Sequence, residues 1–143
     1  MKKVIPQIKV EDVAIAIVPR AQEESEIAES SSGEDDLWDV YLVNLKEDAL
    51  NSVLITSKGY GALEGETRKT TVLRHFFERI GPLTCTQIEP IQTKLFRMTN
   101  EYWISFSLND YMYDKKYVFV KGSIDEMNFT TIPLLKRKGV MIK

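Results

Sequence analysis

The chain has 143 residues, 43% of them hydrophobic, which is enough for one ordinary core and too few for two. Its single cysteine, Cys85, excludes an internal disulfide framework, and no apolar run reaches the roughly 18 residues of a membrane-spanning helix. The formal net charge of −2 is unevenly distributed along the chain. Residues 21–36 hold seven acidic and no basic residues, whereas the rest of the chain holds 14 acidic and 19 basic residues. We therefore expect a cytoplasmic protein that forms one β-rich domain over residues 1–143 and does not enter membranes.

The first predicted element is a strand over Val13–Val18, a short apolar run rich in β-branched residues that is closed by Pro19. Because apolar residues occupy both alternating sets of positions, we expect this strand to be buried on both faces. Residues 21–36 follow, an acidic and Ser-rich stretch with one isoleucine and no aromatic residue. Such a stretch buries too little apolar area to offset its ordering entropy, so the sequence predicts a mobile loop.

Further strands are predicted where β-branched and aromatic residues recur between turn signals. They cover Trp38–Leu45, Val53–Thr56, Thr84–Ile91, Tyr102–Leu108 and Tyr113–Val120. Asn109 and Asp110 lie between the last two and are typical of a hairpin turn.

Residues 70–80 fit two structures. As a short helix ending at Gly81, they place Val72, Phe76 and Ile80 on one face, whereas as a strand they place Arg74 among apolar residues. We favour the strand, because the surroundings are all β and a seventh strand completes two packed sheets. The predicted fold class is therefore mainly β, an immunoglobulin-like β-sandwich of about seven strands with at most one short helix. The alternative is an α+β fold with a helix at 70–80.

Six segments of the sequence carry a family resemblance: WDVYLVN, VLITSKGYG, RKTTVLRHFF, NEYWISF, YDKKYVFV and IPLLKRKGVMIK. Together, over Val10–Lys143, they resemble a family of short bacterial chains typical of the Bacteroidetes, some of which carry the name of a phenylalanyl-tRNA synthetase alpha subunit. The chain is far smaller than a synthetase catalytic domain. It also lacks the paired arginine and acidic motifs that hold ATP in that class, so the resemblance implies no aminoacylation.

The sequence gives only weak signals for a metal site or a phosphate site. One histidine and one cysteine cannot form a zinc site, and Glu34, Asp35 and Asp36 lack the ordered spacing of a calcium loop. Gly59-Tyr60-Gly61 and Gly65 are not followed by the Lys-Ser/Thr pair of a P-loop. We interpret them as hairpin glycines with positive φ, and we expect no bound metal or cofactor.

His75 is the one candidate for acid–base chemistry. A general base would need an orienting carboxylate and a nearby nucleophile, and Glu78 and Glu89 are candidate partners in space. We favour a structural histidine bonded to the backbone, and we expect no catalytic residue.

Aromatic residues concentrate late in the chain, with eight of the 14 between Phe96 and Phe119. Alternation from Tyr111 places tyrosines and lysines on one face, a composition found both in stacking platforms for single-stranded nucleic acid and in sandwich cores. We favour packing in the core or against neighbouring strands.

The basic turn 136–138 could contact phosphate, an acidic partner or the acidic segment of this chain. The candidate interaction surface consists of Tyr111, Tyr113, Lys115, Tyr117, Lys121, Lys136, Arg137 and Lys138.

The function expected from these features is that of a non-catalytic cytoplasmic protein-interaction or accessory module, whose partner is another protein or a second copy of itself. One alternative is a nucleic-acid-associated or RNA-associated accessory protein, against which the isoelectric point of about 5.5 argues. The other is a small enzyme or ligand binder that uses His75.

Overall fold

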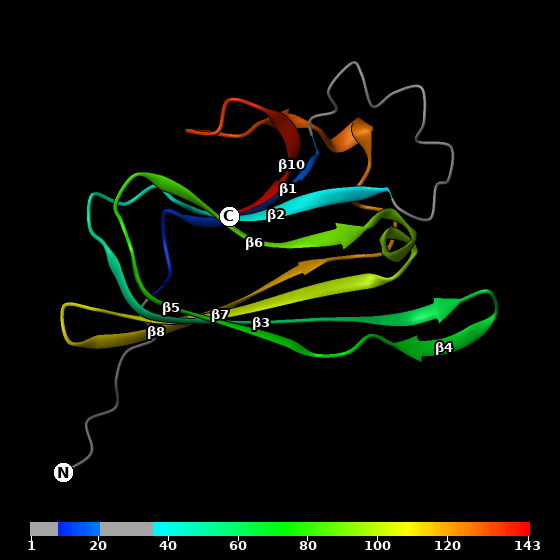
Figure 1. The fold of residues 1–143 in the computed structure, drawn as a ribbon, viewed down its shortest axis with the longest axis horizontal. Coiled ribbons are helices and arrows are strands. Elements are labelled where there is room, and N and C mark those ends of the chain that lie inside the picture. The colour runs from blue at the N-terminus through cyan, green and yellow to red at the C-terminus, as the bar shows by residue number, and fades with distance from the viewer. Residues whose placement is uncertain (1–8, 21–35) are drawn as a thin grey trace, which may run out of the picture.

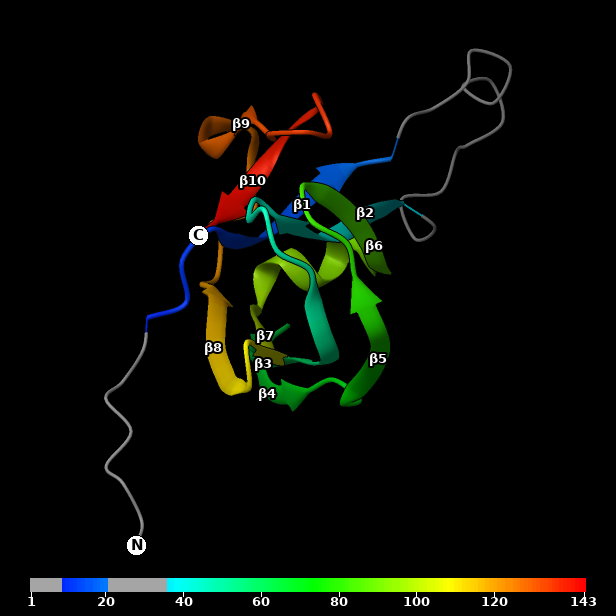
Figure 2. The same cartoon turned by 90° about the vertical axis from the view of Figure 1, so that its left-hand side faces the viewer.

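The computed structural model describes residues 9–20 and 36–143, which form two antiparallel five-stranded sheets packed face to face (Figures 1 and 2). The predicted β-sandwich is confirmed, with ten strands in place of about seven. The loop prediction for 21–36 falls, except for Asp36, outside the described residues and stays a prediction. No helical segment in the described ranges has the length and apolar character needed to cross a membrane.

The first sheet has the strand order β6-β2-β1-β10-β9, with β1 at Val13–Pro19, β2 at Leu37–Asn44, β6 at Thr84–Gln92, β9 at Thr130–Thr131 and β10 at Lys138–Ile142. The second sheet has the order β4-β3-β7-β8, and β5 also pairs with β3. Its bounds are β3 Leu50–Leu63, β4 Glu66–Lys69, β5 Leu73–Ile80, β7 Thr99–Leu108 and β8 Tyr111–Phe119. Two short 3-10 helices are η3 at Thr93–Arg97 and η4 at Glu126–Asn128.

Strand β1 is buried on both faces, as its sequence predicts. Ile15 and Ile17 face the second sheet in the main core, whereas Ala14 and Ala16 belong to a smaller cluster on the outer face. Residues 132–137 cover that outer face, since Ile132 is fully buried in the same cluster. The first sheet is therefore shielded from solvent by a later part of its own chain.

The main core lies between the sheets and is built from their alternating inward positions. It is closed at the β8 edge by Tyr117, whose hydroxyl donates a 2.6 Å hydrogen bond to the carbonyl oxygen of Val13. The largest fully buried side chains include Tyr117, Phe106, Phe119, Ile15, Ile17 and Leu42.

Residues 73–80 form strand β5, so the strand prediction for this region is confirmed. Leu54 pairs with Phe76 and Ile55 with His75. This register turns Phe77 toward the core and places Arg74 on the exposed side. The backbone hydrogen bonds of this segment are satisfied by β3, which removes the need for a helix.

The glycine prediction is correct in part. Gly65 has a φ of 82° and forms the turn between β3 and β4 together with Glu64, whose φ is 56°. Gly61 also has a positive φ, of 132°, but it lies with Gly59 inside strand β3, which runs much further than the predicted 53–56. The predicted turn at Asn109 and Asp110 is confirmed, since both residues have positive φ, as a tight hairpin requires.

Candidate functional site

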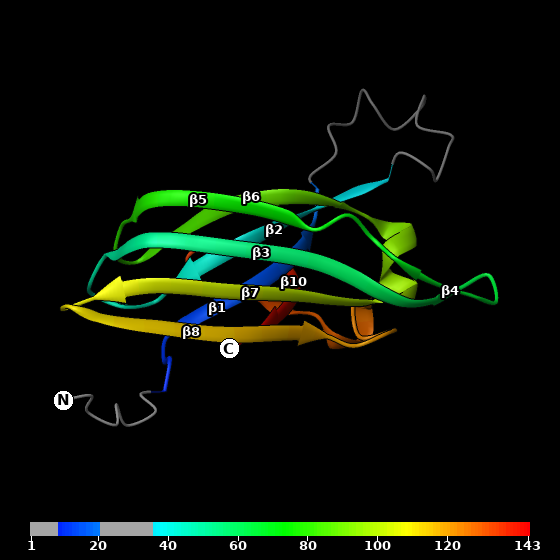
Figure 3. The ribbon, with the colours of Figure 1, turned by 90° about the horizontal axis from the view of Figure 1, so that it is seen from below.

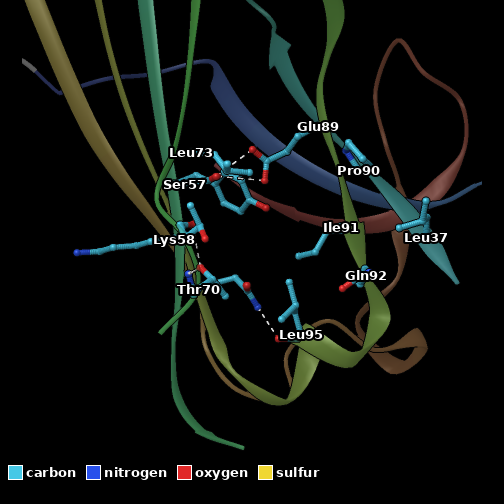
Figure 4. Close-up of a pocket in the computed structure, with 14 residues that line it drawn as sticks. Leu37, Ser57, Lys58, Thr70, Leu73, Glu89, Pro90, Ile91, Gln92 and Leu95 are labelled. Carbon is cyan, nitrogen blue, oxygen red and sulfur yellow. Dashed lines mark hydrogen bonds between the residues drawn. The ribbon is translucent and has the colours of Figure 1, made fainter. Parts of the chain in front are cut away.

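A cavity of about 330 Å³ lies between the two sheets, near the point where β6 leads into η3 (Figure 4). It exists because the inward positions of β3 change along the strand, from Val53 and Ile55 to the small residues Ser57 and Gly59. Its walls are largely apolar, with Leu37, Leu73, Pro90, Ile91 and Leu95 among the lining residues.

A β-bulge in β6 turns a carboxylate toward this cavity. Val40 pairs with Glu89 but Tyr41 pairs with Gln87, so Ile88 is the extra residue. Ile88 packs in the main core, and Glu89, its direct neighbour, lines the cavity on the same side of the sheet. Regular alternation would place the two on opposite faces, and bulges next to binding sites commonly redirect side chains in this way.

Glu89 joins three strands of the two sheets. The Ser57 hydroxyl on β3 donates to both carboxylate oxygens, at 2.9 and 3.1 Å, and Nε2 of His75 on β5 lies 2.6 Å from Oε1. The Glu89 side chain is 10% exposed. The expectation that His75 bonds the backbone is therefore wrong, and of the two carboxylates considered the structure selects Glu89.

The order of these groups differs from that of a hydrolase triad. In a triad the imidazole lies between the nucleophile and the carboxylate and accepts the nucleophile's proton. In this protein the carboxylate lies between Ser57 and His75, so the Ser57 proton points to Glu89. The cluster is suited to binding a hydrogen-bond donor, and it does not activate Ser57 through His75.

Tyr102 adds a second polar group to the cavity. The residue is 2% exposed, and its hydroxyl makes no hydrogen bond to another described residue. No fully sealed polar side-chain atom in the described part of the chain lacks a partner, so this hydroxyl is reached from the cavity. Burial, and then the negative charge of Glu89, raise the pKa of Tyr102, which keeps the phenol protonated.

Within residues 9–20 and 36–143, no group of three or more His, Cys, Asp or Glu side chains is arranged to hold a metal ion. Cys85 donates a weak hydrogen bond to the Pro133 carbonyl oxygen, and burial raises the pKa of its thiol. The thiol is therefore held in its less reactive, protonated form.

The tyrosines of the candidate interaction surface do not form an open platform. Tyr117 is 1% exposed and Tyr113 stacks on Phe106 at a centroid distance of 5.3 Å, so both face the core. Lys115 lies with its Nζ 5.0 Å from the centre of the Tyr117 ring. Only Tyr111 and Lys121, at the two ends of this row, are exposed. The favoured interpretation, packing, is therefore confirmed for Tyr113 and Tyr117, and Tyr117 does not belong to the candidate interaction surface because its ring is buried.

The basic turn lies on the other sheet, away from the tyrosines. Arg137 donates to the Tyr41 hydroxyl and to the carbonyl oxygen of Pro19, and it thereby holds residues 132–137 against the first sheet. Lys136 and Lys138 are exposed. Of the three basic residues, Arg137 thus has a structural role.

The outer face of the second sheet carries an apolar cluster that the sequence analysis did not identify. Phe76, Leu54 and Trp103 are 62%, 40% and 47% exposed. Leu54 pairs directly with Phe76 and with Ser105, two residues from Trp103, so the three side chains share one face. In Figure 3, which views the molecule from this side, β5, β3, β7 and β8 lie in front of β1, β2 and β10. We call Leu54, Phe76 and Trp103 the exposed cluster.

Charged residues adjoin the exposed cluster. Glu101, only 6% exposed, lies between Lys58 and Lys116, whose Nζ atoms are 3.6 and 3.7 Å from its carboxylate oxygens. The Lys116 Nζ also lies 5.3 Å from the centre of the Trp103 ring. One signal in the sequence could have revealed this face. In a strand, Arg74, Phe76 and Glu78 share one face, so Phe76 is an aromatic residue between two charged ones.

Comparisons of this chain with protein-family models, with curated proteins and with solved structures found no match.

Proposed function

We propose that the protein is a non-catalytic cytoplasmic interaction module that binds an acidic partner protein through the exposed cluster. The main support is the difference between the two outer sheet faces. Residues 132–137 cover the first sheet, whereas the second presents three adjoining apolar side chains of which two are aromatic. Contiguous exposed apolar surface on a soluble domain marks an interaction site, and tryptophan is enriched among the residues that dominate interface energies.

The charge in the row that contains Trp103 favours acidic groups on the partner at that point. Along one row of the sheet, Arg74 pairs with Thr56, Thr56 with Trp103 and Trp103 with Lys116, so cations lie on both sides of the tryptophan. The adjacent row runs from Phe76 through Leu54 and Ser105 to Asp114, so the cationic side of the cluster is the side of Trp103. Carboxylates near an apolar anchor would complement the row that contains Trp103.

The nucleic-acid alternative rested on the row of tyrosines and lysines along β8. That row contributes Tyr113 and Tyr117 to the core and leaves Tyr111 as its one exposed tyrosine, so it offers no run of rings for successive bases. The exposed cluster has one tryptophan and one phenylalanine on separate strands, and Glu101 partly neutralises the nearby lysines. We therefore propose a protein, and not a nucleic acid, as the partner.

A site-specific photo-crosslinker tests it. With p-benzoylphenylalanine in place of Phe76, we expect a discrete cross-linked product in cell extract and no cross-linked dimer of the purified protein. The product should decrease as salt rises, because the flanking cations are exposed and are screened. It should disappear when Trp103→Ser is added, a change expected to alter the free energy of unfolding by about 1 kcal/mol or less at a half-exposed site.

The matched control places the same crosslinker at Met127, which is 84% exposed and lies in η4. It should give no product. Equal products from both positions, or a product at position 76 that survives Trp103→Ser, would contradict the proposal. A dimer formed by the purified protein would replace the acidic partner with a second copy.

A further inference from the structure

The cavity between the sheets has the size and the lining of a small-ligand site. Its volume of about 330 Å³ lies at the lower end of the range that small-molecule pockets occupy. Leu37, Ile91 and Leu95 supply apolar contact, Glu89 supplies a carboxylate, and Thr70, Gln92 and Asn100 add neutral polar side chains. In Figure 4, Glu89 and Ser57 lie at one end of the cavity and Leu95 lies at the other. A ligand with an apolar body and one polar end matches this division.

The charged end of the cavity carries the Glu89 carboxylate, and among the described residues His75 is the basic side chain next to it. A carboxylate can accept about four hydrogen bonds, and only Ser57 and His75 donate to Glu89 among the described residues. Lys58 is the one lysine or arginine that lines the cavity. Its Nζ is 3.6 Å from Glu101, and the side chain points away from the cavity in Figure 4. Glu89 therefore retains acceptor capacity toward the interior.

Tyr102 gives the site a second acceptor. Its hydroxyl opens to the cavity and has no partner among the described residues. A neutral phenol both donates and accepts, so the Tyr102 oxygen can accept a hydrogen bond from a ligand while its O–H remains available to an acceptor within the cavity. Two acceptors beside an apolar space favour a ligand head that carries several N–H donors.

We propose that this cavity binds a small organic cation, an ammonium group on a short apolar body, with the ammonium on Glu89 and Tyr102. A bound cation offsets the cost of holding a carboxylate in a largely buried position. A carboxylate or phosphate ligand would instead be repelled by Glu89. His75 acts as a positioning residue, because it holds the Glu89 carboxylate from the side of β5. The site is separate from the exposed cluster, so either proposal can fail alone.

Three probes of nearly equal shape test the head-group preference. Benzylamine, benzyl alcohol and benzoate are titrated into the full chain and followed by the amide resonances of Ile91 and Tyr102. We expect benzylamine to bind about tenfold or more tightly than benzyl alcohol, as a charged hydrogen bond predicts, and benzoate to bind most weakly. Benzoate binding as tightly as benzylamine, or no saturation by any probe up to about 10 mM, would overturn the proposal.

Two variants locate the effect. Glu89→Gln should remove the tenfold preference for benzylamine and leave the affinity for benzyl alcohol within about threefold. The matched control is Glu101→Gln, which changes a carboxylate of similar burial on the outer face of the second sheet, and it should leave the preference intact. Leu73→Trp, at a 44% exposed position of the cavity lining, should weaken all three probes together. If Glu89→Gln and Glu101→Gln act alike, the cation does not sit on Glu89, and the proposal is wrong.

Discussion

Replacing Tyr117 with alanine is expected to lower the free energy of unfolding by about 3 to 5 kcal/mol, as for other buried aromatic residues. The ring is 1% exposed, so its removal leaves a cavity between β8 and the first sheet. The substitution also leaves the Val13 carbonyl oxygen without the donor that reaches it from β8. Urea unfolding followed by tryptophan fluorescence measures the change.

A second substitution separates the contribution of the Tyr117 ring from that of its hydroxyl, and a third serves as an exposed control. Tyr117→Phe keeps the packing and removes the 2.6 Å hydrogen bond, so we expect a loss of about 1 to 2 kcal/mol. Tyr111→Ala, at a residue that is 53% exposed, should cost about 0.5 kcal/mol or less. A Tyr117→Ala protein as stable as Tyr111→Ala would mean that the tyrosine row faces solvent, and it would revive the stacking platform.

Gly139→Ala is expected to destabilise the protein by at least about 3 kcal/mol, at or beyond the upper end of ordinary overpacking effects. Gly139 lies in β10 beside β1, where an added Cβ would overlap Val18 Cγ1 and come within 2.6 Å of the carbonyl oxygen of Ile17. Because one of these atoms belongs to the backbone, a rotamer change cannot relieve the overlap. A lower melting temperature, or loss of soluble folded protein, is the expected result.

Gly81→Ala is the matched control. An alanine Cβ at Gly81 would meet its nearest atoms at 3.7 Å, an ordinary contact, so the stability should change by about 0.5 kcal/mol or less. If both substitutions have the same small effect, β10 does not pass β1 as closely as the structure indicates.

The fold was largely predictable because runs of strand-forming residues recur between turn signals. Val13–Val18 is apolar at every position, and only a strand covered on both sides can bury it, as the structure shows. Residues 70–80 were ambiguous because helix and strand periods both fit, and pairing with β3 decides between them. The short strands β4, β9 and β10 were missed. The four residues of β4 are all exposed, so β4 has no apolar pattern to detect.

The candidate sites were far less predictable. Alternation indicates which residues share a face but not which face is inside, so the tyrosines and lysines of β8 fitted both a core and an open surface, although packing was favoured. The contact between His75 and Glu89 needs both a sheet-to-sheet approach and the bulge at Ile88, neither of which follows from periodicity. The exposed cluster combines residues of three strands, so its members become neighbours only when the register is known.

The position of β10 inside the first sheet has a consequence for biosynthesis. Ile15 pairs with Ile142, and β10 separates β1 from β9, so the sheet cannot be completed before residues 138–142 have been translated, well over a hundred residues after β1. Until then, β1 presents an apolar strand with an unpaired edge, which can recruit other nascent chains. We expect ribosome-bound chains that stop before residue 138 to depend on a holdase chaperone, and sheet closure to begin only once residues 138–142 have left the exit tunnel.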